Sequence, residues 1–170
     1  LNQIAPEKQS IVKLHKSDTP IFEEYGIERQ IKTAFGRTVT MSKGAYLIIE
    51  HTEALHVIDV NSGNRSTKAK NQEDSAREVN MVAATEIARQ LRLRDMGGII
   101  VIDFIDMTPV RHQREVENRM RDAVHQDRAR IQLGRISRFG LLEMSRQRLR
   151  PSIGETSQST CPRCSGTGHI

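Results

Sequence analysis

The sequence contains no tryptophan, and aromatic residues occupy only 4% of its 170 positions. Hydrophobic residues make up 36% of the chain, and the mean hydropathy is −0.53. These values are low for a domain that must bury a large core of its own, because buried apolar surface is what offsets the entropy of ordering the chain. We therefore expect a subdomain that packs against neighbouring domains or against a second copy of the chain.

Long hydrophobic runs and a disulfide framework are also missing. No apolar run approaches the roughly 20 residues that a membrane-spanning helix requires, and no signal peptide is visible. The only two cysteines lie in one C-x-x-C motif at 161–164. A single such pair does not make a disulfide scaffold, so we expect a protein of the reducing cytoplasm.

Lysine is absent from the most basic part of the chain. The net charge is +5, and residues 111–150 contain eleven arginines against five acidic residues. Arginine forks match the geometry of phosphate groups, which predicts a polyanionic partner. From 128 to 150 apolar residues alternate with arginines, which suggests strands that present cations on one face. The alternative is a solvated face of ion pairs, although five acidic residues can neutralise only part of this charge.

Hydrophobic periodicity predicts strands alternating with helices, and therefore an α/β (α+β) fold with a mixed sheet. Helices are expected over 21–35, with Gly36 as its cap, over 73–94, and from Thr108-Pro109 onward. The second helix should bury a stripe of apolar residues, and Asn71 can cap its start. That stripe consists of Val79, Ala83, Ile87 and Leu91. Strands are expected at 11–14, 39–41, 46–49, 54–60, 99–102, 131–136 and 141–144, the third and fourth of which resemble a hairpin.

Two of the predicted strands end at an aspartate. The run of β-branched residues at 99–102, which we expect to be buried on both faces, stops at Asp103, and a shorter apolar run stops at Asp59. Asn61 points to the same face as Asp59 and could orient a water or a phosphate. Two carboxylates at one edge of a sheet suit Mg²⁺. An isolated aspartate at a strand end is more often a turn or cap residue, an alternative that is stronger for Asp106.

The C-x-x-C motif, Cys161-Pro-Arg-Cys164, precedes a glycine-rich segment and has the form of a zinc knuckle. Structural zinc takes four ligands and this chain offers two thiolates, so the motif predicts half a site that a second chain completes. His169 is close but poorly spaced to complete the site within one chain. A redox pair and an inert dithiol remain alternatives, although a redox C-x-x-C normally opens a helix of a thioredoxin-like fold.

Three blocks of sequence are similar to the catalytic region of the bacterial ribonuclease E/G family. They are EIARQLRLRDMGGIIVIDFIDM at 86–107, RISRFGLLEMSRQRLRPS at 135–152 and CPRCSGTG at 161–168. The resemblance implies an endoribonuclease of RNA processing and mRNA decay. Such an enzyme cleaves single-stranded RNA with Mg²⁺ and leaves 5′-phosphate and 3′-hydroxyl ends. It also implies a zinc ion shared between two subunits of a homodimer, which assembles further into a dimer of dimers in the full-length enzyme.

The resemblance also assigns roles to individual residues of this sequence. It implies that Asp59 and Asp103 are the Mg²⁺ ligands, with Asn61 beside the first of them. Cys161 and Cys164 would supply the zinc half-site. Arg130 matches a position that senses the 5′ end of the RNA, and we expect it to bind RNA together with Arg138 of the arginine-rich segment.

The resemblance further implies three parts of the chain. Residues 1–34 would be the tail of an RNase H-like subdomain, 35–157 a DNase I-like catalytic subdomain, and 158–170 the zinc link. The loop at 63–72 departs from the family in length. The chain starts with leucine and lacks an OB-type RNA-binding domain, so we expect a piece of a larger nuclease that is not fully active alone. Contacts with RNA-decay partners or with a membrane surface would involve regions outside this piece.

A non-enzymatic RNA-binding or dimerisation module is the competing interpretation. In that case the two aspartates would be structural, and the cysteine pair would only clip two chains together. Binding of Mg²⁺ or Mn²⁺ that is lost when either aspartate becomes asparagine distinguishes the two.

Overall fold

The computed structural model describes residues 4–63, 72–151, 159 and 161–164. The chain divides into two compact units, residues 1–36 and residues 37–170. None of the helices in the described part of the chain has the length and apolar character that a bilayer span requires. The assignment of the segments to RNase H-like, DNase I-like and zinc-link parts stays a prediction.

The first unit consists of short helices: η1 (Pro6–Ile11), α1 (Ile21–Glu24) and α2 (Ile27–Ala34). The single helix expected over 21–35 is broken because Gly26 adopts a left-handed conformation, with φ of 65°. The strand expected at 11–14 is wrong, since η1 reaches Ile11 and the next residues form no strand. No residue of α1 or α2 is buried. These two helices therefore contribute nothing to a core within the described residues.

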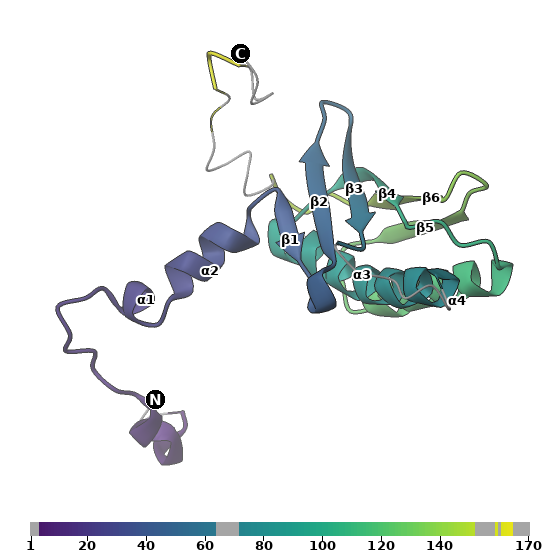
Figure 1. The fold of residues 1–170 in the computed structure, drawn as a ribbon. Helices are drawn as coiled ribbons and strands as arrows, with labels where there is room; N and C mark the ends of the chain where they lie inside the picture. The colour runs from purple at the N-terminus through teal and green to yellow at the C-terminus, as the bar shows by residue number, and fades with distance from the viewer. Residues whose placement is uncertain (1–3, 64–71, 152–158, 160, 165–170) are drawn as a thin grey trace. The chain divides into compact units, whose positions relative to one another are not determined.

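The second unit is built on a six-stranded mixed sheet. Its strands are β1 (Thr38–Thr40), β2 (Tyr46–His51), β3 (Leu55–Asn61), β4 (Gly98–Asp103), β5 (Ile131–Ile136) and β6 (Leu141–Arg146). Their order in space is β1-β2-β3-β4-β6-β5 (Figure 1). β3 and β4 are parallel, and the other neighbours are antiparallel. The expected α/β (α+β) class with a mixed sheet is confirmed, and a short turn, η2 (Ser42–Gly44), links β1 to β2.

Two helices, α3 (Gln72–Arg94) and α4 (Val110–Val124), pack together against the sheet (Figure 1). α3 connects β3 to β4, as parallel neighbours require, because a tight turn cannot join them. The four residues of its predicted apolar stripe are all buried. Pro109 is the N-cap of α4 rather than its first residue, and Asn71, the cap proposed for α3, lies outside the described residues.

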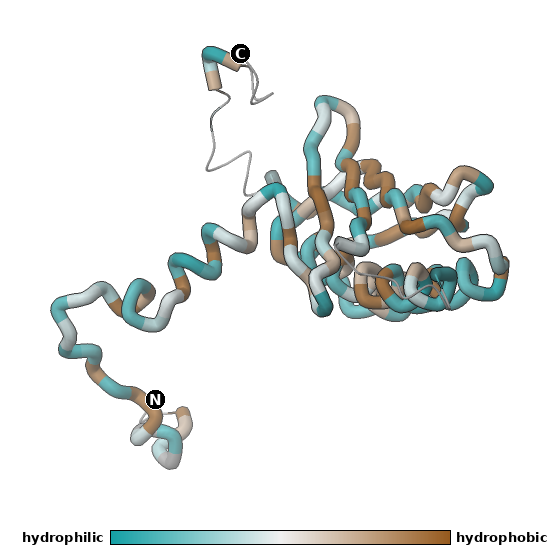
Figure 2. The backbone as a smooth tube through the Cα atoms, viewed as in Figure 1, coloured by the Kyte–Doolittle hydropathy of each residue, from teal (hydrophilic) through white to brown (hydrophobic). Residues whose placement is uncertain are grey.

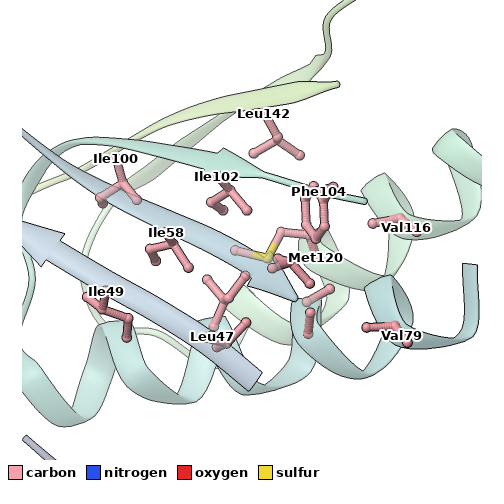
Figure 3. Packing of buried hydrophobic residues seen from close by; sticks show 14 of the residues in the cluster. Leu47, Ile49, Ile58, Val79, Ile100, Ile102, Phe104, Val116, Met120 and Leu142 are labelled. Carbon is pink, nitrogen blue, oxygen red and sulfur yellow. The ribbon is translucent and has the colours of Figure 1, made fainter. Parts of the chain in front are cut away.

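The core lies between this helix pair and one face of the sheet. In Figure 3 side chains such as Leu47, Ile102 and Leu142 point from the strands towards Val79 and Val116 of the helices. Burial of one such aliphatic side chain contributes roughly 1.5–3 kcal/mol to folding. Figure 2 shows hydrophobic stretches along the strands, whereas α2 is mostly hydrophilic. Among the described residues, the buried apolar side chains thus all lie in the second unit.

The opposite face of the sheet, which we call the uncovered face, carries alternate residues of each strand. Ile99 of β4 is 54% exposed and Val101 is half-buried, whereas Ile100 and Ile102 are fully buried. The expectation that this strand is buried on both faces is therefore wrong. A run of β-branched residues indicates a strand, but it cannot reveal that α3 and α4 cover only one side of the sheet.

α3 ends without a glycine in the left-handed region. The residue with a left-handed backbone just past the helix is Asp95, with φ of 50°. Aspartate tolerates this conformation better than most residues because its short polar side chain can bond locally. Here the Asp95 carboxylate instead accepts a hydrogen bond from Arg146 at 3.0 Å. The turn after α3 is therefore held by an ion pair.

Candidate metal and RNA site

The pairing of β3 with β4 places Asp59 directly beside Asp103. In-register residues of parallel neighbours project from the same face, and adjacent strands lie roughly 4.8 Å apart. Both carboxylates project from the uncovered face, because the residues that alternate with them, Ile58 and Ile102, are buried under the helices. The structure thus brings together the two aspartates that the sequence singled out, although their role as ligands remains to be tested.

Negative charge accumulates at this end of the sheet. Desolvation raises the pKa of Asp103 even though the residue is exposed overall, and the negative charges of Asp59 and Asp106 raise it further. Among the described residues, none of these three aspartates takes part in an ion pair. We call the three of them the acidic edge. A cation bound there would relieve their mutual repulsion.

Asn61 orients the first carboxylate. Its side-chain Nδ2 donates a hydrogen bond to Oδ2 of Asp59 at 2.7 Å. The two residues are separated by one position in β3, so both side chains project from the uncovered face. We expected Asn61 to orient a water or a phosphate, and the structure shows that it restrains Asp59.

A residue that the sequence interpretation missed, Asn80 of α3, fixes the segment after β4. Its Nδ2 donates to the carbonyl oxygen of Ile105 at 2.7 Å, and its Oδ1 accepts from the backbone N–H of Ile105 at 3.1 Å. Asn80 is fully buried, so both bonds are shielded from water. An asparagine on the buried stripe, between Val79 and Ala83, was the signal that could have identified it.

The turn between β5 and β6 lies against the acidic edge. Leu141, the first residue of β6, pairs with Asp103. Gly140 has φ of 80°, and a methyl group added there would lie 3.1 Å from Oδ1 of Asp106. The positive φ favours glycine, and the turn approaches Asp106 closely at this residue. Arg138 lies at the tip of this turn. Of the two predicted RNA-binding arginines, it is therefore the one beside the aspartates.

Arg130 lies at the opposite end of the sheet. It precedes β5, whose first residue pairs with Arg146, and Arg146 in turn pairs with Gly98 at the start of β4. Arg130 lines a shallow pocket of about 380 Å³ with three other polar side chains. These are Gln132, Ser145 and Gln147. The structure therefore does not bring Arg130 and Arg138 together.

The expectation that alternating arginines present cations on one face is wrong for β6. Arg146 has a side chain that is 3% exposed and forms ion pairs with Asp95 at 3.0 Å and Asp127 at 2.9 Å. Burial alone would raise the pKa values of these carboxyl groups, but hydrogen bonds from Arg146, and from Arg150 to Asp95, lower both. Part of the arginine charge is therefore neutralised by these two aspartates. We call Asp95, Asp127, Arg146 and Arg150 the ion-pair cluster.

The cysteine pair can be placed only in part. Cys161 is exposed and Cys164 is half-buried, and neither forms a disulfide. His169 and the glycine-rich segment lie outside the described residues. Within the described ranges, no three side chains of His, Cys, Asp or Glu gather into a metal-binding group. The zinc half-site therefore stays a prediction.

The acidic edge fits Mg²⁺ better than it fits structural zinc. Mg²⁺ prefers hard oxygen donors, keeps several waters and is commonly held by one or two carboxylates together with substrate phosphates. Asp59 and Asp103 supply such a pair, and the repulsion from Asp59 and Asp106, which adds to desolvation in raising the pKa of Asp103, favours a cation. Structural zinc would require four closely arranged donors, which these residues do not supply.

Comparisons with known proteins give a consistent result. The model of the ribonuclease E/G family matches residues 1–149. Ribonuclease E of Haemophilus influenzae is 60% identical over 167 residues, covering 98% of this chain and 18% of that protein. Ribonuclease E of Escherichia coli is 61% identical over 165 residues, covering 97% of this chain and 16% of that protein.

Ribonuclease G of Haemophilus influenzae is more distant, with 38% identity over 169 residues that cover 99% of this chain and 34% of that protein. The chain thus spans less than a fifth of these ribonuclease E relatives and about a third of this ribonuclease G. The family match covers most of the chain, including both strands of the acidic edge. This chain belongs to the ribonuclease E/G family.

Proposed function

We propose that this chain supplies the catalytic metal site of an endoribonuclease that cleaves single-stranded RNA by Mg²⁺-assisted hydrolysis. The products would carry 5′-phosphate and 3′-hydroxyl ends, and the reaction would serve RNA processing and decay. The observation that carries the proposal is the in-register pair of Asp59 and Asp103 on two parallel strands. The ribonuclease names of the relatives support the substrate class.

Two aspartates of the acidic edge would bind the ion, and two asparagines outside it hold their surroundings in position. Asp59 and Asp103 would hold the ion through carboxylate oxygens, and Asn61 keeps the Asp59 carboxylate in one orientation. Asn80 fixes the backbone two residues beyond Asp103. When bound, Mg²⁺ stabilises negative charge on a phosphate oxygen and lowers the pKa of a water. The rigid strands present both ligands with little loss of conformational freedom at the time of binding.

Arginines would hold the RNA backbone. Arg138 lies beside the acidic edge and would contact phosphates near the scissile bond, whereas Arg130 would bind RNA farther along the sheet. Phosphate contacts position the nucleic acid without reading its sequence. They also make the affinity fall with salt, with a log–log slope of about 0.7 per phosphate contact for single strands.

The test is neutralisation of each aspartate in the complete protein. Asp59→Asn and Asp103→Asn should lower cleavage by orders of magnitude and abolish Mn²⁺ binding, while RNA affinity stays nearly unchanged. Glu143→Gln is a matched control, because Glu143 is an exposed carboxylate on the neighbouring strand, opposite Val101. Cleavage within about threefold of wild type in either aspartate variant would refute the metal site.

The alternative, a non-enzymatic RNA-binding and dimerisation module, makes the opposite prediction. In that case the wild-type protein would bind RNA without binding Mn²⁺, and both asparagine variants would behave like the parent. Within the part of the chain that the structure describes, no cation pairs with the acidic edge. This argues for the enzyme, because a purely structural aspartate pair gains stability from a neutralising partner within the protein.

We also propose that Cys161 and Cys164 bind zinc together with the same pair of a second chain. The sequence contains no other cysteine, and a tetrahedral structural site needs four ligands. The protein should then contain about half an equivalent of this zinc per chain, and a strong chelator or Cys161→Ser should convert dimers to monomers. One zinc per chain in a protein that sediments as a monomer would contradict the shared site and favour His169 as a ligand.

A further inference from the structure

Phe139 stands out among the side chains near the acidic edge. It is 69% exposed, although the sequence has only four phenylalanines. A single exposed apolar residue is ordinary on a protein surface and carries no inference alone. Phe139 differs because it lies at the tip of the turn that contacts the acidic edge and because a cation packs on its ring.

The turn that presents Phe139 is tightly hydrogen-bonded. The backbone N–H of Ser137 donates to the carbonyl oxygen of Leu141 at 2.8 Å, and that of Gly140 donates to the carbonyl oxygen of Ser137 at 3.0 Å. The N–H of Phe139 itself donates to Oγ of Ser137 at 3.2 Å. The ring is therefore held out from a rigid support, so little backbone entropy is lost when a ligand contacts it.

Arg138 covers part of the phenylalanine ring. Its guanidinium carbon lies 4.8 Å from the ring centroid, within the range of a cation–π interaction. The large exposed fraction of Phe139 leaves the rest of the ring open to solvent. A guanidinium stacked on an aromatic ring still has N–H groups directed outward, and these can donate to a phosphate. The pair thus combines a flat apolar surface with a phosphate-binding group.

The position of the ring relative to Asp103 follows from the strand register. Leu141 pairs with Asp103, and Phe139 lies two residues before Leu141. Leu141 and Asp103 have Cα atoms about 5 Å apart, and two residues of chain span at most about 7 Å, so the backbone of Phe139 lies within roughly 12 Å of that of Asp103. That separation suits the base of a nucleotide flanking the bond whose phosphate is held at the acidic edge.

We propose that Phe139 is a stacking platform for an unpaired RNA base next to the scissile phosphodiester, with Arg138 packed on the ring and bound to the adjacent phosphate. The proposal rests on the proposed function, since it locates RNA by the metal site. Every base has a π-face, so the platform would not select one base over another. It would instead favour single strands, because a base within a duplex is already stacked and paired.

The first experiment compares the complete wild-type protein with Phe139→Leu on RNAs that each lack the base at one position around the cleavage site. In the wild type, removal of one flanking base should lower kcat/KM about tenfold, the size expected for loss of one base–aromatic stack. Phe139→Leu should lose about tenfold on intact RNA and nothing more on that abasic RNA. Phe139→Tyr, which keeps the ring, should resemble the parent.

The second experiment reports contact directly and does not depend on cleavage. The sequence contains no tryptophan, so Phe139→Trp places a single fluorescent indole in this chain at the turn. In an Asp103→Asn background, in which RNA remains uncut, intact RNA should quench this fluorescence. RNA that lacks the flanking base should quench it far less. Ile99→Ala is a control for loss of exposed apolar surface, since Ile99 lies at the other end of β4 and should leave both readouts unchanged.

The outcomes separate this proposal from the proposed function. If Phe139→Leu and each abasic position lowered kcat/KM independently and additively, the platform would be refuted and the metal site would be unaffected. The platform would also be refuted if Phe139→Leu changed the association state or the melting temperature while its response to each abasic RNA stayed like that of the wild type. Phe139 would then pack against another part of the protein. Quenching by RNA in a protein whose wild type never cleaves RNA would overturn the proposed function, and with it the location of the platform beside a scissile bond.

Discussion

The two ends of β4 carry opposite arrangements of charge. At its carboxyl end, Asp103 faces Asp59, and the ion pairs of the described residues leave both aspartates out. Just before its amino end, Asp95 shares the buried guanidinium of Arg146 with Asp127. Aspartate thus forms ion pairs before one end of the strand, whereas at the other end it has no ion-pair partner among the described residues.

The pKa shifts express this difference. Desolvation and the neighbouring carboxylates raise the pKa of Asp103, whereas hydrogen bonds from arginine outweigh burial and lower the pKa values of Asp95 and Asp127. A carboxylate that serves the fold is neutralised within the protein, and one that serves a ligand keeps its charge for that ligand. The charges around an aspartate therefore distinguish a structural carboxylate from a ligand-binding one better than its location at a strand end does.

Removal of the shared cation should have the largest effect on stability. Arg146→Met leaves two carboxylates without their buried partner and should cost about 3–5 kcal/mol of the free energy of unfolding. Hydrogen exchange of the β4 and β6 amides in the complete protein measures this locally. Asp103→Asn, which removes a repelled charge, should leave the same amides as protected as in the wild type or more so.

Arg150→Met is the matched control for that comparison. Arg150 also pairs with Asp95, but its side chain is 77% exposed, so its loss should cost less than about 1 kcal/mol. Equal losses of protection in the Arg146 and Arg150 variants would show that the ion-pair cluster does not depend on burial. The proposed contrast between the two ends of β4 would then fail.

Asn80→Ala should have an intermediate effect on the free energy of unfolding, and it should also affect cleavage at the acidic edge. It leaves the N–H and the carbonyl oxygen of Ile105 without their buried partner, which should cost about 1–3 kcal/mol. Because Ile105 follows Asp103 by two residues, cleavage should fall about 10- to 100-fold, the range for residues that orient metal ligands. Urea unfolding and kcat/KM measured on the same preparation test both effects. Lost stability with unchanged cleavage would remove Asn80 from the support of the site.

The acid dependence of stability should be the smallest effect. The pKa values of Asp95 and Asp127 lie below the ordinary 3.8, so in acid the unfolded chain binds more protons than the folded one. Their contribution is present at neutral pH and should be lost progressively below about pH 4. In Arg146→Met this loss should shrink, because Asp127 loses its hydrogen-bonded cation and Asp95 keeps only that of Arg150. Parallel pH–stability curves for the two proteins would contradict the assignment.

Much of the fold follows from local patterns in the sequence. The bounds of β5 match the predicted strand, and the stripe of α3 is buried as its helical spacing indicates. The juxtaposition of Asp59 and Asp103 was also predictable, because two strands that each end in aspartate can share one edge of a sheet. Their pairing in register depends on the parallel crossover, which no local pattern specifies.

The features that the sequence did not reveal depend on tertiary contacts. Arg146 follows the buried residues Leu142 and Met144 at alternate positions of β6, so its burial was implied by period 2, but its charge suggested the surface. Its partners, Asp95 and Asp127, come from separate turns that only the fold brings together. The break at Gly26 was signalled by the glycine itself, although the apolar spacing continued across it.

The connection between β3 and β4 contains the whole of α3, so Asp59 and Asp103 become neighbours only after the chain has closed a long loop. Pairings of this kind form slowly, whereas a local hairpin such as β5–β6 forms quickly. A full-length chain that refolds from denaturant would therefore acquire the turn that carries Arg138 and Phe139 before it acquires its paired carboxylates. On the proposed function, a refolding chain passes through a stage in which it can hold RNA but cannot yet cut it.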